Sequence, residues 1–246
     1  MIYKTQLKRI VMEPLYRQVK KKITESLVKG DWNPGQSIPS EIELAQVYDV
    51  SQGTVRKAID ELTDERILIR RQGKGTFVAS HNEENIQLRF LRLTSNSGVK
   101  EKLDNELISF KKEKANNHLA KSLQINANST VISIKRILTF NKTPLIYDHI
   151  KIPASYFRGL NEDKVLERNG SMYRMYEMDY GIRMISAEEK IKAVSADSES
   201  ASLLKIDQKT PLLSVERLAY TYDQMPIEWR YGLCFTQDHY YWAELD

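Results

Sequence analysis

The first eighty residues carry apolar positions at helical spacing. In the first segment these positions recur every four residues, at Leu15, Val19, Ile23 and Leu27. Pro14 stands before this segment and Gly30 after it. The pattern therefore predicts an amphipathic helix between them, with Lys20, Lys21 and Lys22 on its solvent side.

Two more helices are expected in the next thirty residues. Ser40 stands three residues before Glu43, which is the spacing of a capping box, and this predicts a helix that extends to about Tyr48. Ser51 can cap the helix that follows, because serine accepts hydrogen bonds from the free N–H groups of a first turn. The apolar residues of this third helix fall on one face: Val55, Ala58, Ile59 and Leu62.

After Arg66 the pattern changes to two short β-prone segments, residues 67–70 and 76–79, around the turn "QGKG". Glycine-rich turns between such segments predict a hairpin. Three helices followed by a hairpin is the order of a winged helix-turn-helix, so we expect residues 1–79 to form such a domain. Residues 80–92 are polar and are expected to link it to a second domain, residues 93–246.

The second domain contains an internal repeat. The segment "ANNHLAKSLQINANSTVISIKR" aligns with "ADSESASLLKIDQKTPLLSVER" at a constant offset of 81 residues. The matched pairs are Ala115 and Ala196, Ala120 and Ala201, Leu123 and Leu204, Ile125 and Ile206, Ser133 and Ser214, and Arg136 and Arg217. Each copy predicts a helix, a strand, a tight turn and an antiparallel strand. We therefore expect a duplicated α+β fold around one mixed or antiparallel sheet.

Composition adds information mainly through charge. Residues 1–80 hold 14 Lys+Arg against 10 Asp+Glu, whereas the remainder holds 23 of each, so the net charge of +4 lies in the first third. A basic small domain favours a polyanionic partner. No apolar run resembles a signal peptide or a membrane span, so a cytoplasmic protein without a membrane partner is expected. Cys234 is the single cysteine, and the four histidines lack metal-ligand spacing, so no disulfide, metal or cofactor is expected.

The first turn of the third predicted helix has the residue types that read DNA. In a helix-turn-helix, the N-terminal residues of the second helix contact base edges in the major groove. Gln52 can pair with adenine and Arg56 with guanine or phosphate, while Gly53 lets a backbone approach closely. Arg70, Arg71 and Lys74 on the hairpin suit phosphate or minor-groove contacts. The alternative is an ordinary solvated turn of a packed helix.

The stretch "IPSEIELAQVYDVSQGTVRKAIDELTDERILIRRQGKGTFV" resembles the DNA-binding domain of GntR-type bacterial transcriptional regulators, and the resemblance covers residues 14–78. It implies contacts with DNA from Ser40, Glu41, Ser51, Gln52, Gly53, Thr54, Arg56, Lys57, Arg71, Lys74, Gly75 and Thr76. The family usually has arginine where Ile42 and Gln52 stand here, so its usual operator core is not expected.

From about residue 88 to the end, the sequence resembles the effector-binding UTRA domain of the HutC subfamily, whose fold is similar to chorismate lyase. The residues that carry this resemblance include "GSMYRMY", "DYGIR" and "MPIEWRYGLCFTQDHYYW". The resemblance implies a homodimer that binds a palindromic DNA operator and is released from it, or rearranged on it, by a small metabolite. It also implies the effector-binding residues Arg136, Asp148, Ser171, Tyr173 and Glu228.

Three departures bear on the effector. Leu138 replaces an arginine common on the first strand, Asp148 replaces a glutamate, and Cys234 falls where several members have tyrosine. The missing arginine weakens the case for a sugar phosphate, although Arg136 can still pair with a carboxylate or a phosphate. An alternative is that Arg136 and one of the carboxylates form a buried structural ion pair.

The sequence therefore favours a ligand-responsive transcription factor, most simply a repressor. Two alternatives remain open. One is an enzyme on the chorismate-lyase-like domain with a DNA-binding tether, although no histidine or nucleophile is well placed for it by motif. The other is a constitutive DNA-binding protein whose second domain only dimerises.

Overall fold

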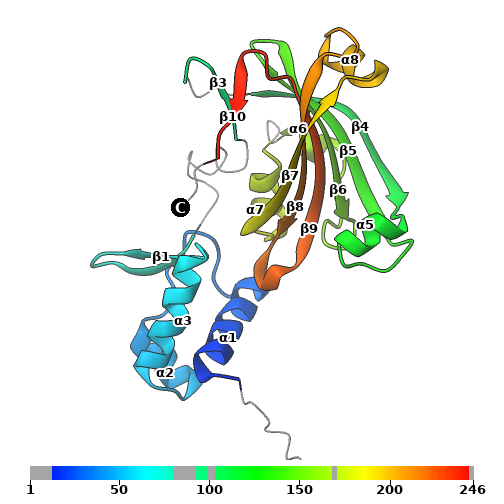
Figure 1. Ribbon diagram of the computed structural model, residues 1–246. Helices are drawn as coiled ribbons and strands as arrows, with labels where there is room; N and C mark the ends of the chain where they lie inside the picture. Colours follow the sequence, from blue (N-terminus) through cyan, green and yellow to red (C-terminus); the bar gives the residue numbers. More distant parts are fainter. Residues whose placement is uncertain (1–12, 80–91, 99–102, 168–170, 244–246) are drawn as a thin grey trace, which may run out of the picture. The chain divides into compact units, whose positions relative to one another are not determined.

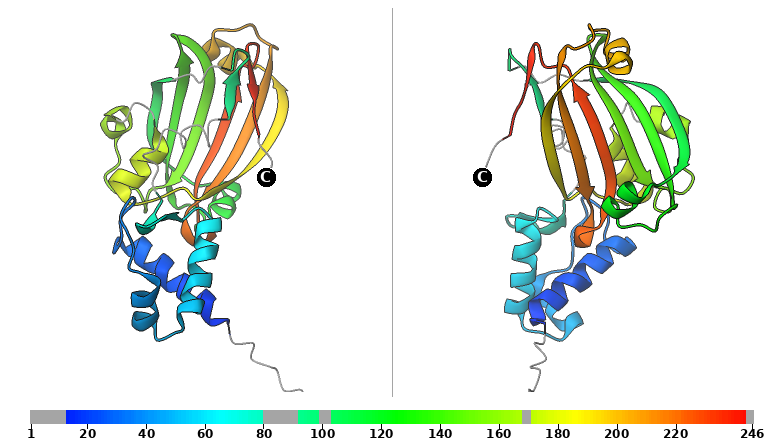
Figure 2. Two further views of the ribbon diagram at one scale, coloured as in Figure 1. Left: turned by 90° about the vertical axis from the view of Figure 1, so that its left-hand side faces the viewer. Right: turned by 45° about the vertical axis from the view of Figure 1, so that its right-hand side comes forward.

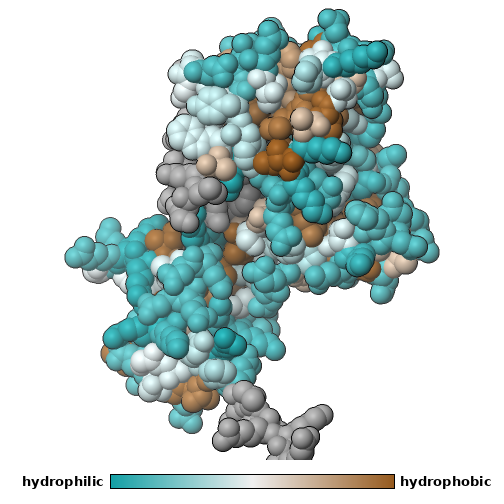
Figure 3. Space-filling view, viewed as in Figure 1, coloured by the Kyte–Doolittle hydropathy of each residue, from teal (hydrophilic) through white to brown (hydrophobic). Residues whose placement is uncertain are grey.

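The computed structural model describes residues 13–79, 92–98, 103–167 and 171–243 and divides the chain into two compact units, Met1–Ala79 and Ser80–Asp246 (Figure 1). Apart from Arg92, the predicted linker lies outside the described residues. Hydrophilic side chains cover most of the surface seen in Figure 3, and the largest apolar patch in that view lies on the second unit.

In residues 13–79 the first unit contains three helices and a hairpin, as expected for a winged helix-turn-helix. The elements are α1 (Leu15–Lys29), α2 (Glu41–Tyr48), α3 (Gln52–Asp64), β1 (Leu68–Arg71) and β2 (Gly75–Val78). The strands begin and end one residue away from the predicted bounds. Ser40 and Glu43 form the predicted capping box, and the Ser51 side chain accepts a hydrogen bond from the Thr54 N–H. Gly30 ends α1 in the left-handed region at φ 81°, where glycine carries no steric cost.

The predicted apolar face of α3 forms the centre of this unit. Val55, Ala58, Ile59 and Leu62 are all 0% exposed, and Ile23 of α1 is equally buried. Full burial of such a side chain stabilises the fold by roughly 1.5–3 kcal/mol. Lys20, expected on the solvent side of α1, instead pairs with Glu61 and Glu65 at Nζ–O distances of 3.1 and 2.5 Å. These pairs join α1 to the C-terminal end of α3.

The second unit is built on a six-stranded sheet with the order β4-β5-β6-β9-β8-β7, and all its pairings are antiparallel. The strands are β4 (Asp104–Lys114), β5 (Thr130–Phe140), β6 (Thr143–Pro153), β7 (Ser186–Ser195), β8 (Pro211–Tyr220) and β9 (Pro226–Cys234). The helices are α5 (Asn117–Ser122), α6 (Glu162–Glu167), α7 (Met172–Tyr180), α8 (Ser198–Leu204) and the 3-10 turn η1 (Tyr222–Gln224). No helix within the described ranges is long and apolar enough to span a membrane.

The sequence repeat appears as a duplicated unit within this sheet. Strands β4, β5 and β6 form one half, strands β7, β8 and β9 form the other, and the halves meet where β6 pairs with β9. Helices α5 and α8 precede β5 and β8 at equivalent places. Each copy of the repeat includes one strand more than the alignment of the two sequence segments indicated, because β4 and β7 also occupy equivalent positions. The duplicated α+β fold is therefore confirmed.

The two faces of the sheet carry different covers. Ile134 and Ile150 pack with Met175 and Tyr176 of α7, whereas the side chain of Val131 points to the opposite face and packs with Leu123, which follows α5. Figure 2 shows α7, in yellow-green, against one face of the sheet. A small two-stranded sheet of β3 (Leu93–Ser95) and β10 (His239–Tyr241) completes the unit. We call it the β3–β10 ribbon.

The β3–β10 ribbon covers the far end of the face that α7 covers. Leu93 and Tyr241 of the ribbon pack against a cluster that includes Leu138 and Ile146. Leu138 and Ile134 lie an even number of residues apart on β5, so they point to the same face of the sheet. The middle of this face, between α7 and the ribbon, is therefore the place where polar side chains can gather inside the unit.

Candidate functional sites

In the first unit the predicted DNA-binding residues lie at the start of α2, the start of α3 and the hairpin. Ser40 and Ser51 are the N-caps of α2 and α3, and both hydroxyls hydrogen-bond within their first turns. A Cβ at Gly53 would meet nothing within the described chain closer than Ser51 Oγ at 3.9 Å. Packing inside the unit therefore does not require glycine at this position, which leaves its small size available for a partner.

Glu41 connects the three elements of this surface. One of its oxygens accepts from Arg56 Nε at 2.9 Å and from Gln52 Nε2 at 3.3 Å, and the other accepts from Arg70 Nη2 at 3.1 Å. The Arg56 side chain is still 58% exposed, and within the described ranges its Nε carries the contact with Glu41. A carboxylate is repelled by phosphate, so these contacts favour a positioning role for Glu41 within the predicted set.

The hairpin places further basic groups at its tip and edge. Lys74 lies in the turn, and Gly75 and Thr76 open β2, with Gly75 in the left-handed region at φ 103°. The Arg71 guanidinium lies 4.6 Å from the centre of the Phe77 ring. Lys57 instead stacks on Tyr16, with its Nζ 4.1 Å from the ring centre. Glu41 therefore accepts hydrogen bonds from Gln52, Arg56 and Arg70, whereas Lys57 contacts Tyr16.

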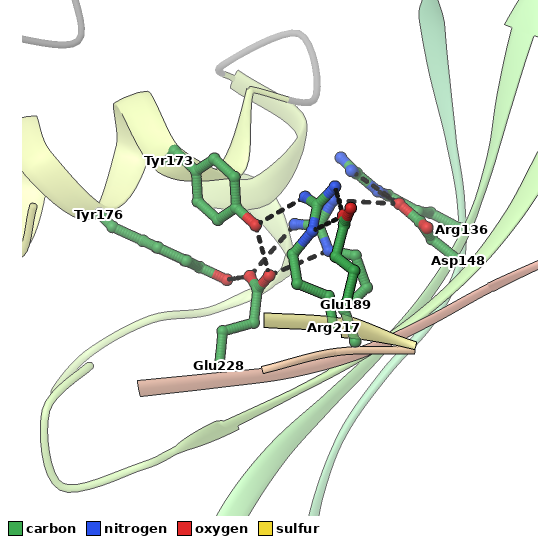
Figure 4. Close-up of polar contacts among 8 residues, drawn as sticks. Arg136, Asp148, Tyr173, Tyr176, Glu189, Arg217 and Glu228 are labelled. Carbon is green, nitrogen blue, oxygen red and sulfur yellow. Dashed lines mark hydrogen bonds and ion pairs between the residues drawn. The ribbon is translucent and has the colours of Figure 1, made fainter. Parts of the chain in front are cut away.

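In the second unit six charged side chains from five strands meet in the middle of the face between α7 and the β3–β10 ribbon (Figure 4). These residues, which we call the charge cluster, are Arg136, Asp148, Glu189, Arg217, Glu228 and Arg230. Strand register explains why they meet. Arg136 pairs across the strands with Asp148, Arg217 pairs with Arg230, and Glu189 pairs with Arg217.

Arg136 and Asp148 form a buried ion pair, which was one of the two alternatives left open by the sequence. Nη2 and Nε of Arg136 lie 2.9 and 3.1 Å from Asp148 Oδ2, and the side chains are 3% and 4% exposed. Burial by itself would raise the pKa of Asp148, but Arg230 and Arg136 outweigh it and hold the pKa below its ordinary value. Asp148 is therefore ionised at neutral pH.

Glu228 has four hydrogen-bond donors around it and is fully buried. Tyr173 and Tyr176 of α7 donate to its two oxygens at 2.9 and 2.7 Å. Arg230 donates from Nε and Nη2 at 3.0 and 3.1 Å, in the forked arrangement that arginine makes with carboxylates. Burial raises the pKa of both tyrosines, so they remain neutral donors. Of the predicted effector residues, Tyr173 and Glu228 thus lie in direct contact.

Arg217 and Glu189 extend the cluster toward the ribbon. Arg217 donates from Nε to Glu189 Oε1 at 2.6 Å and from Nη1 to the Tyr173 hydroxyl at 3.1 Å. The other oxygen of Glu189 accepts a hydrogen bond from the hydroxyl of Tyr241 on β10. The sequence prediction of the site missed Arg217, Glu189, Arg230 and Tyr241. The repeat pairs Arg217 with Arg136, and Arg230 and Tyr241 lie within the segment "MPIEWRYGLCFTQDHYYW" that carries the resemblance, but no feature of the sequence marked Glu189.

A small cavity lies beside the charge cluster, between the sheet and the β3–β10 ribbon. Its volume is about 40 Å³, and its lining residues are Arg92, Leu93, Ile146, Asp148, Val215, Arg217, Arg230, Gly232, Cys234 and Tyr241. A Cβ at Gly232 would stand 3.2 Å from Asp148 Oδ1, so glycine keeps this space open. Arginines here can bind an anionic group, and Asp148 can accept from hydroxyl or amino groups.

The predicted effector residues differ in their position relative to this cavity, which Asp148 lines. Arg136, Tyr173 and Glu228 belong to the hydrogen-bonded network but do not line the cavity. Ser171 is the N-cap of α7, and its side chain makes no capping hydrogen bond. Cys234 lines the cavity as a buried thiol, and burial with the nearby Asp148 raises its pKa to about 12. A buried thiol of this kind behaves as a small hydrophobic residue.

These features define a class of protein: a winged helix-turn-helix unit joined to a second unit that has a charge cluster beside a small cavity on a duplicated sheet. Comparison with known families places the chain within this class. The model for bacterial regulatory proteins of the gntR family matches residues 15–78, and the UTRA domain model matches residues 100–240. The chain belongs to the GntR family and has the HutC-type arrangement, with a UTRA domain after the DNA-binding domain.

Individual relatives agree with this assignment. The chain is 30% identical over 213 residues to the probable fructoselysine utilization operon transcriptional repressor of Escherichia coli (strain K12), with 87% of each chain covered. It is 29% identical over 234 residues to the mannosyl-D-glycerate transport/metabolism system repressor MngR of the same strain, covering 92% of this chain and 94% of MngR. The structure of PhnF from Mycobacterium smegmatis shares the fold with a TM-score of 0.56 at 23% identity, covering 93% and 99%.

Removal of the Asp148 charge tests the buried ion pair. We expect Asp148→Asn to lower the free energy of unfolding by about 3–5 kcal/mol at pH 7, because it leaves Arg136 buried without its counter-charge. A carboxyl with a lowered folded-state pKa stabilises the fold above its unfolded pKa of about 4, and this contribution is lost as pH falls through the folded-state pKa. The variant should therefore lose less stability than the wild type on acidification below about pH 4.

The free energy of unfolding is measured by hydrogen exchange of the β5 and β6 amides in the full chain, with and without urea. The control is the double variant Arg136→Leu/Asp148→Leu. It removes both charges and should lower the free energy of unfolding by less than the single change does. A single variant that is more stable than the double variant contradicts the assigned role of the pair.

Proposed function

We propose that this chain is a homodimeric transcriptional repressor that binds a palindromic operator and is released from it, or rearranged on it, by a carbohydrate-derived organic acid. The observation that carries the proposal is the charge cluster beside the cavity of the UTRA domain, in a chain that also has a winged helix-turn-helix. The relatives described above are named as repressors, which favours this function over the enzyme alternative.

The DNA contacts are assigned to the exposed first turn of α3 and to the hairpin. Gln52 and Thr54 stand at the N-terminal end of α3, where a recognition helix meets base edges. Arg56 keeps its two terminal nitrogens available while Glu41 holds its Nε, which suits a forked contact with guanine or phosphate. Arg71 and Lys74 on the hairpin supply contacts to the phosphate backbone. A dimer would place two such surfaces on two half-sites, hence the palindromic operator.

The class of effector follows from the chemistry of the cavity together with the names of two relatives. Fructoselysine and mannosyl-D-glycerate are both polyhydroxylated and both carry a carboxylate. The cavity has three arginines, Arg92, Arg217 and Arg230, against one carboxylate, Asp148. Arginine pairs well with a carboxylate, and Asp148 can accept from sugar hydroxyls. The site therefore suits a ligand that combines an acid group with hydroxyls.

A selection from random duplexes tests the DNA assignment. The full-length chain should enrich a motif with two related half-sites, and binding to it should weaken steeply with salt. Gln52→Arg should change the enriched half-site, because an arginine prefers guanine where glutamine prefers adenine. Arg56→Ala should weaken binding to every enriched duplex. An unchanged motif for Gln52→Arg means that Gln52 does not read bases, and the absence of any enrichment removes the proposed function.

Thermal denaturation with added ligands tests the effector class. Fructoselysine and mannosyl-D-glycerate should each raise the melting temperature of the second unit, since a ligand at 100 times its Kd adds roughly 2.7 kcal/mol. Glucose serves as the neutral control, and Arg92→Ala should reduce the shift caused by the two acids. Equal stabilisation by glucose would show that the acid group is not recognised.

A further inference from the structure

We propose that the β3–β10 ribbon is the movable wall of the effector cavity and that the hydrogen bond from Tyr241 to Glu189 latches it to the charge cluster. When an effector binds, release of this latch would displace the segment that leads to the DNA-binding unit. The role of the effector in this scheme rests on the proposed function. The latch itself is tested without any ligand.

The cavity is small compared with the pockets that hold organic ligands. Its volume of about 40 Å³ holds only a few water-sized groups. Pockets for small organic ligands measure roughly 300–1,000 Å³. A carbohydrate acid with a carboxylate on Arg217 or Arg230 would therefore need one wall of the cavity to move outward.

The two walls of the cavity differ in the length and pairing of their strands. The sheet side of the cavity comes from β6, β8 and β9, which are 9 to 11 residues long and paired on both sides. The ribbon side comes from two strands of three residues each. A two-stranded ribbon alone is marginally stable, so it opens at a lower cost than the central sheet. Arg92, Leu93 and Tyr241 all belong to or adjoin this ribbon and line the cavity.

Glu189 connects the charge cluster to the ribbon through its two oxygens. One oxygen of Glu189 accepts from Arg217 Nε at 2.6 Å, and the other accepts from the Tyr241 hydroxyl. Arg217 also lines the cavity. An anionic ligand group on Arg217 would compete with Glu189 for the guanidinium, and this would disturb the acceptor on which Tyr241 depends. Glu189 is thus a positioning residue that joins cavity, charge cluster and ribbon.

The ribbon also adjoins the predicted linker along the chain. The strand β3 begins at Leu93, and the predicted linker, residues 80–92, precedes it directly. Trp242, which follows β10, donates its backbone N–H to the Arg92 carbonyl oxygen at 2.7 Å. The end of the linker is therefore hydrogen-bonded to the strand that carries Tyr241, so a displaced ribbon also displaces the end of the linker.

The test compares Tyr241→Phe with Tyr240→Phe in the full-length chain. Tyr241→Phe removes only the hydroxyl that donates to Glu189. Tyr240 is the neighbouring residue on the same strand, is 37% exposed and packs against Trp242 with ring centres 6.1 Å apart. Tyr240→Phe is thus a matched loss of a hydroxyl that leaves the latch intact.

Hydrogen exchange provides the first readout. Tyr241→Phe should speed exchange of the ribbon amides about tenfold, as expected for the loss of one hydrogen bond to a charged group, while β5 and β6 exchange as in the wild type. Tyr240→Phe should leave the ribbon unchanged. If ribbon exchange does not respond to Tyr241→Phe, or responds equally to Tyr240→Phe, the latch is overturned.

Operator affinity provides the second readout, measured without ligand on a duplex enriched by the wild type. Tyr241→Phe should shift this affinity several-fold, whereas Tyr240→Phe should not. A loosened ribbon with unchanged operator affinity would overturn the coupling and leave the effector site standing. Failure of the wild type to enrich any duplex would instead count against the proposed function, and the exchange experiment would still decide the latch.

Discussion

Charge balance inside the second unit is the constraint on which the rest of its structure depends. Burial of a single unpaired charge costs several kcal/mol, so a group of buried charges is stable only when each has a partner. The charge cluster meets this condition with three arginines and three carboxylates in contact across five strands. Glu228, the most deeply buried of them, is bonded to Arg230 and to two tyrosines. Any ligand that brings charge to this place must rearrange existing pairs.

That constraint links the effector site to the shape of the fold. The duplicated sheet brings its two halves together along β6 and β9, and the cluster lies across this junction. Equivalent positions of the repeat have taken different partners: Arg136 pairs with Asp148 on β6, whereas Arg217 pairs with Glu189 on β7. Because of this difference, the two sides of the cluster are unlike. The side toward the β3–β10 ribbon borders the cavity, and the other side is closed. A symmetric framework thus supports an asymmetric site.

The first unit uses one carboxylate in a comparable way. Glu41 gathers Gln52, Arg56 and Arg70 from α3 and β1 at the edge of α2. These pairs are solvent-exposed and contribute little to stability, so their effect is on the orientation of side chains. Stability comes instead from the buried face of α3, so the exposed first turn of α3 is not needed for packing.

Much of the fold was predictable from local patterns, because helix caps and apolar periodicity depend on residues within a few positions of one another. Ser40 with Glu43, the cap at Ser51, and the repeat of 81 residues all had this property. Arg136 and Asp148 were singled out by resemblance, but their pairing with each other was left open. The sequence carried no signal for Glu189, Arg230 or Tyr241 as parts of one network. Strand order and register decided that, because they bring together side chains that lie up to about a hundred residues apart, a proximity that no local pattern records.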